Sequence, residues 1–247
     1  MSVLEFKTPG GEQISLAIRQ VLLAGYAGRQ RADVEMHATE MRRLGVPVPA
    51  DLPVFYRAMP CLLTQAGTVD VVGTDTRPEV EFVLFSWNGR RYVTVGNDQF
   101  DLAAERHGWA ERSKNLCQKI VADTAWPLAD VIDHWDKLEL ELSDGGGLLQ
   151  CGPLEMLLEP DKLIELARCG GDFDAGASLL FSGTIPLLRN IDPAARAYSI
   201  RLHDPVLKRE IASTFFLSDI TGPRTRHDPQ GQGAALNGFP SDKVNMR

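Results

Sequence analysis

The 247-residue sequence lacks the features of membrane and secreted proteins. No stretch approaches the roughly 18 consecutive apolar residues that a bilayer-spanning helix needs, and residues 1–7 contain no apolar core before a small-residue cleavage site. Only four cysteines occur, widely spaced and without a CxxC pair, which favours reduced thiols over disulfides. We therefore expect a cytoplasmic protein with no membrane partner.

Basic runs and the common nucleotide or protease motifs are also missing. Lys and Arg total 26 against 33 Asp and Glu, a net charge of −7, whereas nucleic acids are bound through clustered Lys and Arg. We therefore expect no nucleic-acid partner. The patterns GxGxxG, GxxxxGK[ST], HExxH and GxSxG do not occur. The excess of acids permits a bound cation but does not by itself indicate one.

The remaining patterns predict a β-rich protein with few helices. Gly10-Gly11 punctuates a hairpin over residues 1–20, and apolar residues at three- and four-residue steps predict a helix over 31–44. A second helix is expected over 153–168, divided by Pro160. Strands are expected over residues 54–56, 69–72, 80–85, 92–95, 138–142, 177–181, 197–202 and 209–216. We predict a mixed, β-rich α+β fold over residues 1–220, followed by a flexible tail over 221–247.

Two glutamates on one predicted strand form the strongest candidate metal site. Residues two apart on a strand face the same side, so Glu79 and Glu81 bring their carboxylates together. A divalent cation such as Mg²⁺ or Mn²⁺ relieves the resulting repulsion. Asp98, after the next predicted strand, would add a third carboxylate. Most ExE pairs are solvated strand faces, which is our interpretation of the second pair, Glu139 and Glu141.

Two further sets of side chains could support chemistry beside such a site. His37 and Glu40 are neighbours on the predicted helix, where the carboxylate could prepare the imidazole as a general base. Most such pairs are surface pairs, and Asp33 and Glu35 compete as partners. Lys114 could stabilise negative charge on a substrate oxygen, although a lysine judged alone is usually an ordinary surface residue.

Taken in order along the chain, these motifs resemble the fumarylacetoacetate hydrolase family. The resemblance covers roughly residues 20–218. The family's lid is similar to residues 24–57, its Glu-x-Glu metal strand to 79–81 and its Gly-x-Asp/Asn-Asp turn to 96–98. Its lysine falls at residues 113–114, and its Leu-Thr-Gly-Thr-Pro signature is similar to residues 180–186. Two departures are visible, because Arg57 replaces the family's strand lysine and the loop after Asp98 lacks the family's Arg-Asp pair.

The resemblance implies a curved β-roll with a few flanking helices, a lid over about residues 25–52 and a homodimer. It implies a hydrolase that uses Mg²⁺ or Mn²⁺ (with Ca²⁺ possible in a crystal) to cleave a C–C bond of a small dicarbonyl or 2-oxo acid, acylpyruvase-like, through an enolate. The implied residues are the metal ligands Glu79, Glu81 and Asp98, the catalytic His37, Glu40 and Lys114, and the substrate-binding Arg57, Arg106, Gly183 and Thr184.

Other functions remain open on the same residues. An oxaloacetate-type decarboxylase, an isomerase and a sugar-acid dehydratase would all use the same metal–enolate chemistry. A non-catalytic binding protein that retains the fold is the alternative from a different class.

Overall fold

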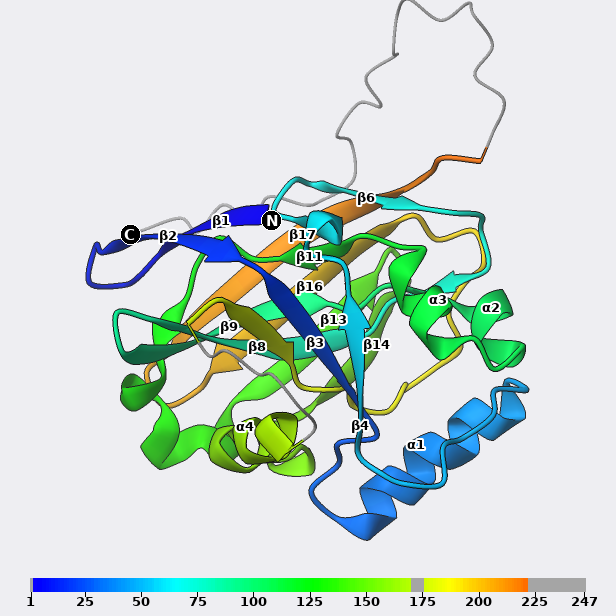
Figure 1. Ribbon diagram of the computed structural model, residues 1–247, viewed down its shortest axis with the longest axis horizontal. Coiled ribbons are helices and arrows are strands. Elements are labelled where there is room, and N and C mark those ends of the chain that lie inside the picture. The colour runs from blue at the N-terminus through cyan, green and yellow to red at the C-terminus, as the bar shows by residue number, and fades with distance from the viewer. Residues whose placement is uncertain (1, 170–175, 222–247) are drawn as a thin grey trace, which may run out of the picture.

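Two curved β-sheets packed against each other form the body of the protein (Figure 1). The computed structural model describes residues 2–169 and 176–221. The larger sheet has the order β4-β3-β15-β8-β9-β11-β5, with β12 paired to β9. Its strands are β3 (Gln20–Gly25), β4 (Val54–Ala58), β5 (Leu63–Thr64), β8 (Val80–Trp87), β9 (Arg90–Asn97), β11 (Lys119–Val121), β12 (Trp126–Pro127) and β15 (Ser178–Phe181).

The second sheet has the order β14-β13-β16-β17-β6. Its strands are β6 (Thr68–Val71), β13 (Glu139–Asp144), β14 (Gly147–Pro153), β16 (Ala197–Asp204) and β17 (Arg209–Asp219). Two small ribbons complete the strands, one of β1 (Ser2–Lys7) with β2 (Gln13–Ile18) and one of β7 (Thr76–Arg77) with β10 (Phe100–Asp101). The predicted β-rich class is confirmed.

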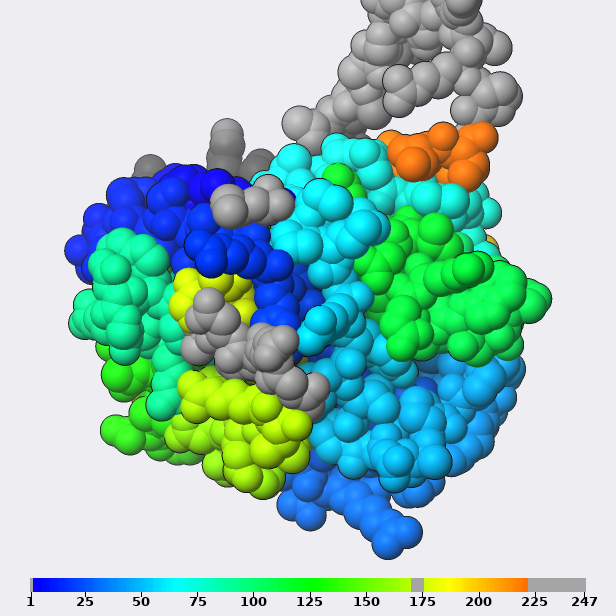
Figure 2. Space-filling view, in the orientation of Figure 1, coloured from blue at the N-terminus to red at the C-terminus, as the bar shows by residue number. Residues whose placement is uncertain are grey.

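Few helices flank these sheets. The α-helices are α1 (Arg31–Arg43), α2 (Leu102–Arg106), α3 (Ala110–Asn115) and α4 (Pro160–Cys169), and short 3₁₀ turns cover Pro60–Leu62, Leu128–Asp130, Ile132–Lys137 and Leu154–Met156. Among the residues described, no helix is long and apolar enough to cross a membrane. Helix α1 lies at one end of the molecule, beside β4 and close to α2 (Figure 1). Residues of α1, β4 and α3 form a continuous surface on this face (Figure 2).

Apart from the hairpin end that joins them, strands β8 and β9 are buried on both faces. One face packs against the second sheet, where Phe82 and Val95 belong to the same hydrophobic cluster as Leu140 and Leu202. The opposite face is covered by the β1–β2 ribbon, whose Phe6 stacks on Phe85 with ring centroids 4.5 Å apart. Burial of both faces excludes water from the strands that carry the candidate metal site.

The sequence predicts most elements but not all of them. The hairpin over 1–20 and the helix over 31–44 are confirmed. Of the helix expected over 153–168, the longer piece is confirmed as Pro160–Cys169, whereas the short first piece is reduced to a 3₁₀ turn over Leu154–Met156 because Pro153 still pairs with β13. Of the predicted tail, residues 222–247 lie outside the described residues. All four cysteines are free, as expected.

Candidate metal centre

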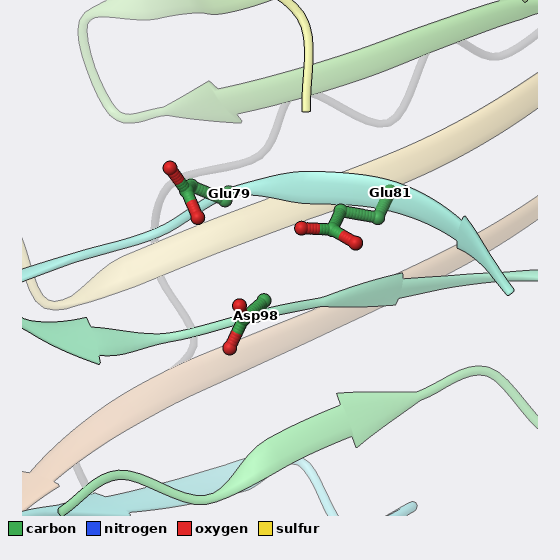
Figure 3. Close-up of side chains that lie close together, drawn as sticks. All are labelled: Glu79, Glu81 and Asp98. Atoms are coloured by element: carbon green, nitrogen blue, oxygen red, sulfur yellow. The ribbon is translucent and has the colours of Figure 1, made fainter. Parts of the chain in front are cut away.

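Three carboxylates converge where β8 begins and β9 ends. Glu79 directly precedes β8, Glu81 is its second residue, and Asp98 directly follows β9. The two strands are antiparallel neighbours, and the Asp98 N–H donates to the Glu79 carbonyl at 2.9 Å. One carboxylate oxygen from each residue lies within 4.8 Å of the others (Figure 3). The structure therefore brings together the three metal ligands predicted from the sequence.

The residues before Asp98 explain how this turn forms. A Cβ at Gly96 would lie 2.8 Å from the Phe181 ring and 2.9 Å from the Ile120 carbonyl oxygen, so only glycine allows the strands to approach. The Asn97 side chain accepts a hydrogen bond from the Glu79 N–H at 2.8 Å. Gly96 and Asn97 thus fix the position of both ends of the cluster.

Two lysines compensate the three carboxylates in part. Lys114 Nζ lies 2.9 Å from Glu79 Oε2 and 2.7 Å from Asp98 Oδ2. Lys119 Nζ, completely buried on β11, lies 2.9 Å from Asp98 Oδ1. Lys114 is a predicted site residue, whereas Lys119 is not. No local pattern separates Lys119 from a surface lysine.

The electrostatics of the cluster fit a divalent cation. Burial, reinforced by Asp98 and Glu79, raises the pKa of Glu81 well above its usual range. Burial opposes the charge of Asp98 too, but Lys114 and Lys119 lower the pKa of Asp98. Against burial, Asp98 and Glu79 hold the pKa of Lys114 well above normal. When all three carboxylates are ionised, as ligation of a cation requires, they and the two ammonium groups leave one net negative charge on a set of oxygen donors that suits Mg²⁺ or Mn²⁺.

The His37–Glu40 pair lies beside this cluster. His37 Nδ1 is 3.6 Å from Glu40 Oε2, and the imidazole packs against Tyr26 with ring centroids 5.2 Å apart. His37 and Lys114 line the same small cavity, of about 20 Å³, together with Glu79, Glu81, Tyr26, Tyr56, Glu105 and Thr184. Helix α1 therefore brings the predicted general base to the metal ligands.

Gly183 and Thr184 also reach the cluster, where their polar groups bond to the protein. Gly183, at a φ of +80°, donates its N–H to Glu81 Oε2 at 2.8 Å. Thr184 Oγ1 donates to the Val80 carbonyl and accepts from the Gln150 side chain, both at 2.8 Å. These contacts hold Glu81 and its strand in place. Contact of either residue with substrate stays a prediction.

The two predicted substrate arginines do not line the cavity that contains His37 and Lys114. Arg106 donates to the Leu44 carbonyl and to Asp75, each at 2.7 Å, and so ties α2 to the end of α1. Arg57 is exposed on β4, and its carbonyl accepts from Asn115. Their roles in substrate binding stay predictions.

Glu105 is a site residue that no pattern in the sequence indicates. It is only 7% exposed, and its Oε2 atom has no hydrogen-bond partner among the residues described. Burial raises its pKa to about 7, with Lys114 opposing the shift and Glu79 and Asp98 adding to it. On α2 it follows no functional pattern, so only the folded structure places it in the cavity.

The raised pKa of Glu105 leads us to expect a specific pH dependence of stability in the metal-free protein. Its pKa rises from 4.5 in the unfolded chain to about 7 in the fold, so folding favours the protonated acid. Stability should therefore fall as pH rises from about 4.5 to 7, by at most about 3 kcal/mol. Glu105→Gln should remove this loss and melt several degrees higher than wild type at pH 8, but not at pH 4.5. If the melting temperatures of wild type and Glu105→Gln in EDTA changed with pH in the same way, Glu105 would not be the group responsible for the loss of stability.

Comparison with solved structures defines the class of fold. The chain is similar to a candidate fumarylpyruvate hydrolase from Burkholderia cenocepacia, at 16% identity, a TM-score of 0.62 and coverage of 89% of this chain and 93% of that one. It is similar to a candidate fumarylacetoacetate hydrolase family protein from Yersinia pestis CO92, at 14% identity, a TM-score of 0.58 and coverage of 87% and 100%. It is also similar to fumarylpyruvate hydrolase from Pseudomonas aeruginosa in complex with Mn²⁺ and pyruvate, at 14% identity, a TM-score of 0.59 and coverage of 89% and 97%.

These likenesses show a fold of the fumarylacetoacetate hydrolase type, as the sequence predicts. Within that fold, the chain belongs to the family described as "Protein of unknown function (DUF2848)", which matches residues 24–215. A comparison with curated proteins gave no match.

Proposed function

We propose that this protein is a divalent-metal-dependent hydrolase that cleaves a C–C bond in a small 2-oxo acid carrying a second carbonyl, as in an acylpyruvate. One observation carries the proposal: Glu79 and Glu81, whose carboxylates converge with that of Asp98, line one cavity together with the His37 imidazole and the Lys114 ammonium group. The similarity to the fold of a fumarylpyruvate hydrolase, whose structure contains Mn²⁺ and pyruvate, supports the same class of chemistry.

Glu79, Glu81 and Asp98 would hold the cation, which we propose to be Mg²⁺ or Mn²⁺. When bound, such a cation supplies Lewis acidity toward carbonyl and carboxylate oxygens. The three ionised carboxylates and the two lysines leave the protein cluster with one negative charge, so a divalent cation would reverse its sign and favour an anionic substrate.

His37 is the proposed general base. Its Nδ1 atom faces Glu40, which leaves Nε2 to accept a proton from water. The water oxygen bonds to the distal carbonyl carbon, and the C–C bond next to that carbon breaks. The bonding electron pair passes to the 2-oxo acid fragment, which takes up the proton from His37. The products are a carboxylic acid and a smaller 2-oxo acid.

Lys114 is the proposed stabiliser of the charge that develops on the departing fragment. Its raised pKa keeps the ammonium group protonated, and two of its three protons face Glu79 and Asp98. The ammonium group also lies 4.4 Å from the centre of the Phe100 ring. This packing restricts its motion, so its charge is directed at the cavity rather than at solvent.

Helix α1 and the segment after it are proposed to act as a lid. The cavity beside the cluster measures about 20 Å³, room for about one water molecule, whereas pockets that enclose a small-molecule ligand measure roughly 300 Å³ or more. An acylpyruvate therefore requires this end of the protein to open.

The predicted homodimer and cytoplasmic location stay predictions.

A substrate screen tests the proposed reaction. Acylpyruvates, oxaloacetate and 2-keto-3-deoxy sugar acids would each be incubated with the protein in Mg²⁺ and in EDTA. We expect EDTA-sensitive loss of acylpyruvate absorbance with release of pyruvate. No turnover of any acylpyruvate would overturn the proposal, and carbon dioxide release from oxaloacetate alone would indicate a decarboxylase.

His37→Ala should retain the metal and lose hydrolysis. General-base removal lowers kcat by about 10²–10⁴-fold, whereas Mn²⁺ affinity should not change because His37 is not a ligand. His203→Ala is the matched control, since His203 pairs with Glu139 at 3.1 Å on the second sheet. Hydrolysis that survives His37→Ala would exclude His37 as the base. Retained decarboxylation with lost hydrolysis would favour the decarboxylase.

A further inference from the structure

A groove of about 780 Å³ leads from the outer surface of α1 toward the candidate metal centre. It runs between α1, including Met36 and Glu40, and the loop over residues 186–191. It shares Glu40, Leu44, Arg77, Leu187 and Ile191 with a small inner cavity, which in turn contains His37 and Glu79. Arg77 therefore borders both the outer groove and the cavity next to the cluster.

The positive charge of the Arg77 guanidinium is not paired with a carboxylate among the residues that the structure describes. Its Nε atom is buried without a hydrogen-bond partner, and its side chain forms no ion pair with any residue that the structure describes. The acids that line the groove face other groups, since Glu35 lies 3.7 Å from Arg42 and Glu40 lies 3.6 Å from His37. Burying a charged donor without a partner is costly, and a bound anion would offset that cost.

Two other arginines, Arg189 and Arg106, are fixed by the protein itself, whereas Arg43, on the outer side of the same groove, is exposed. Arg189, in the same groove, pairs with Asp144 and donates to the Leu148 and Gly147 carbonyls. Arg106 is paired with Asp75. The backbone of Arg77 is held by pairing with Phe100 in the β7–β10 ribbon, two residues before Glu79. Arg77 is thus a rigidly mounted cation beside the metal ligands with a free guanidinium.

We propose that Arg77 binds the distal carboxylate of the substrate and so selects 2-oxo acids that carry a second acid group. This proposal deepens the proposed function and rests on it. With a divalent cation the cluster carries one positive charge, which suits one carboxylate, and Arg77 supplies the second cationic site. A guanidinium suits this task because its planar donors match a carboxylate in a bidentate pair. Leu187 and Ile191 offer apolar contact to the carbon chain between the two acids.

The test compares two substrates that differ only at the far end. Succinylpyruvate ends in a carboxylate, and butanoylpyruvate replaces that carboxylate with a methyl group. The wild-type protein should favour succinylpyruvate in kcat/KM by about 10- to 100-fold. Arg77→Met should abolish this preference mainly through KM, and Arg77→Lys should restore part of it. Arg90→Met, at an exposed position on β9, should keep the wild-type preference.

A binding measurement separates this proposal from the proposed reaction. In EDTA, NMR titration should detect weak succinate binding to wild type and to Arg90→Met, but not to Arg77→Met. A substrate preference that is equal in wild type and Arg77→Met would overturn the role of Arg77 while leaving the hydrolase intact. Succinate binding that depends on Arg77, without turnover of either acylpyruvate, would support the carboxylate site and overturn the hydrolase.

Discussion

Glu81→Gln should abolish Mn²⁺ binding and leave the metal-free protein at least as stable as wild type. Glu81 is 1% exposed, and burial together with Asp98 and Glu79 opposes its charge. Glutamine removes that charge but keeps an oxygen to accept the Gly183 N–H, now bonded at 2.8 Å. The fold therefore loses a repulsion and no hydrogen bond. The cation loses one of three carboxylates, which should weaken binding by more than about 100-fold.

Calorimetric titration with Mn²⁺ and thermal melts in EDTA measure the two halves of this prediction. Glu141→Gln is the matched control, because Glu141 belongs to the second ExE pair and is paired with Arg201 on β16. That variant should bind Mn²⁺ as wild type does. Unchanged Mn²⁺ affinity in Glu81→Gln would remove the proposed site, and a large loss of stability would show that Glu81 supports the fold through its charge.

The metal ligands could be predicted because their signal is local. Glu79 and Glu81 are two residues apart on one strand, and Asp98 ends the strand that follows it in the chain. Adjacent antiparallel strands place such ends together without any information about distant segments. The second ExE pair, Glu139 and Glu141, has the same spacing but a different environment. Leu140 and Leu142 are buried, while the two glutamates form ion pairs with His203 and Arg201 on β16.

The residues that the sequence did not assign depend on distant contacts. Lys119 and Glu105 become site residues only when β11 and α2 pack against the cluster. Strand β3 pairs in parallel with β15, more than 150 residues later in the chain, so its pairing has no local signature. Arg106 is the opposite case, a residue assigned to substrate binding by resemblance. In the fold its guanidinium donates hydrogen bonds to the Leu44 carbonyl and to Asp75, contacts that the sequence does not indicate.

Lys119→Met should destabilise the metal-free protein by about 3–5 kcal/mol, the cost typical of removing one partner from a buried ion pair. Lys119 is completely buried, its Nζ lies 2.9 Å from Asp98 Oδ1, and the same nitrogen donates to the Gln99 carbonyl. Methionine fills similar space but leaves Asp98 with Lys114 as its remaining ion-pair partner. Urea denaturation in EDTA would measure the change in unfolding free energy.

Two further variants identify the cause of the loss. Lys162→Met removes a lysine that is half exposed and paired with Glu165 at 3.0 Å, so it should cost at most about 1 kcal/mol. Adding Asp98→Asn to Lys119→Met should recover part of the stability, because the carboxylate that has lost one of its two lysine partners disappears. A double variant as unstable as the sum of the single variants would instead assign the loss to packing on β11. Mn²⁺ should still bind folded Lys119→Met but not the double variant, because only Lys119→Met retains all three carboxylates.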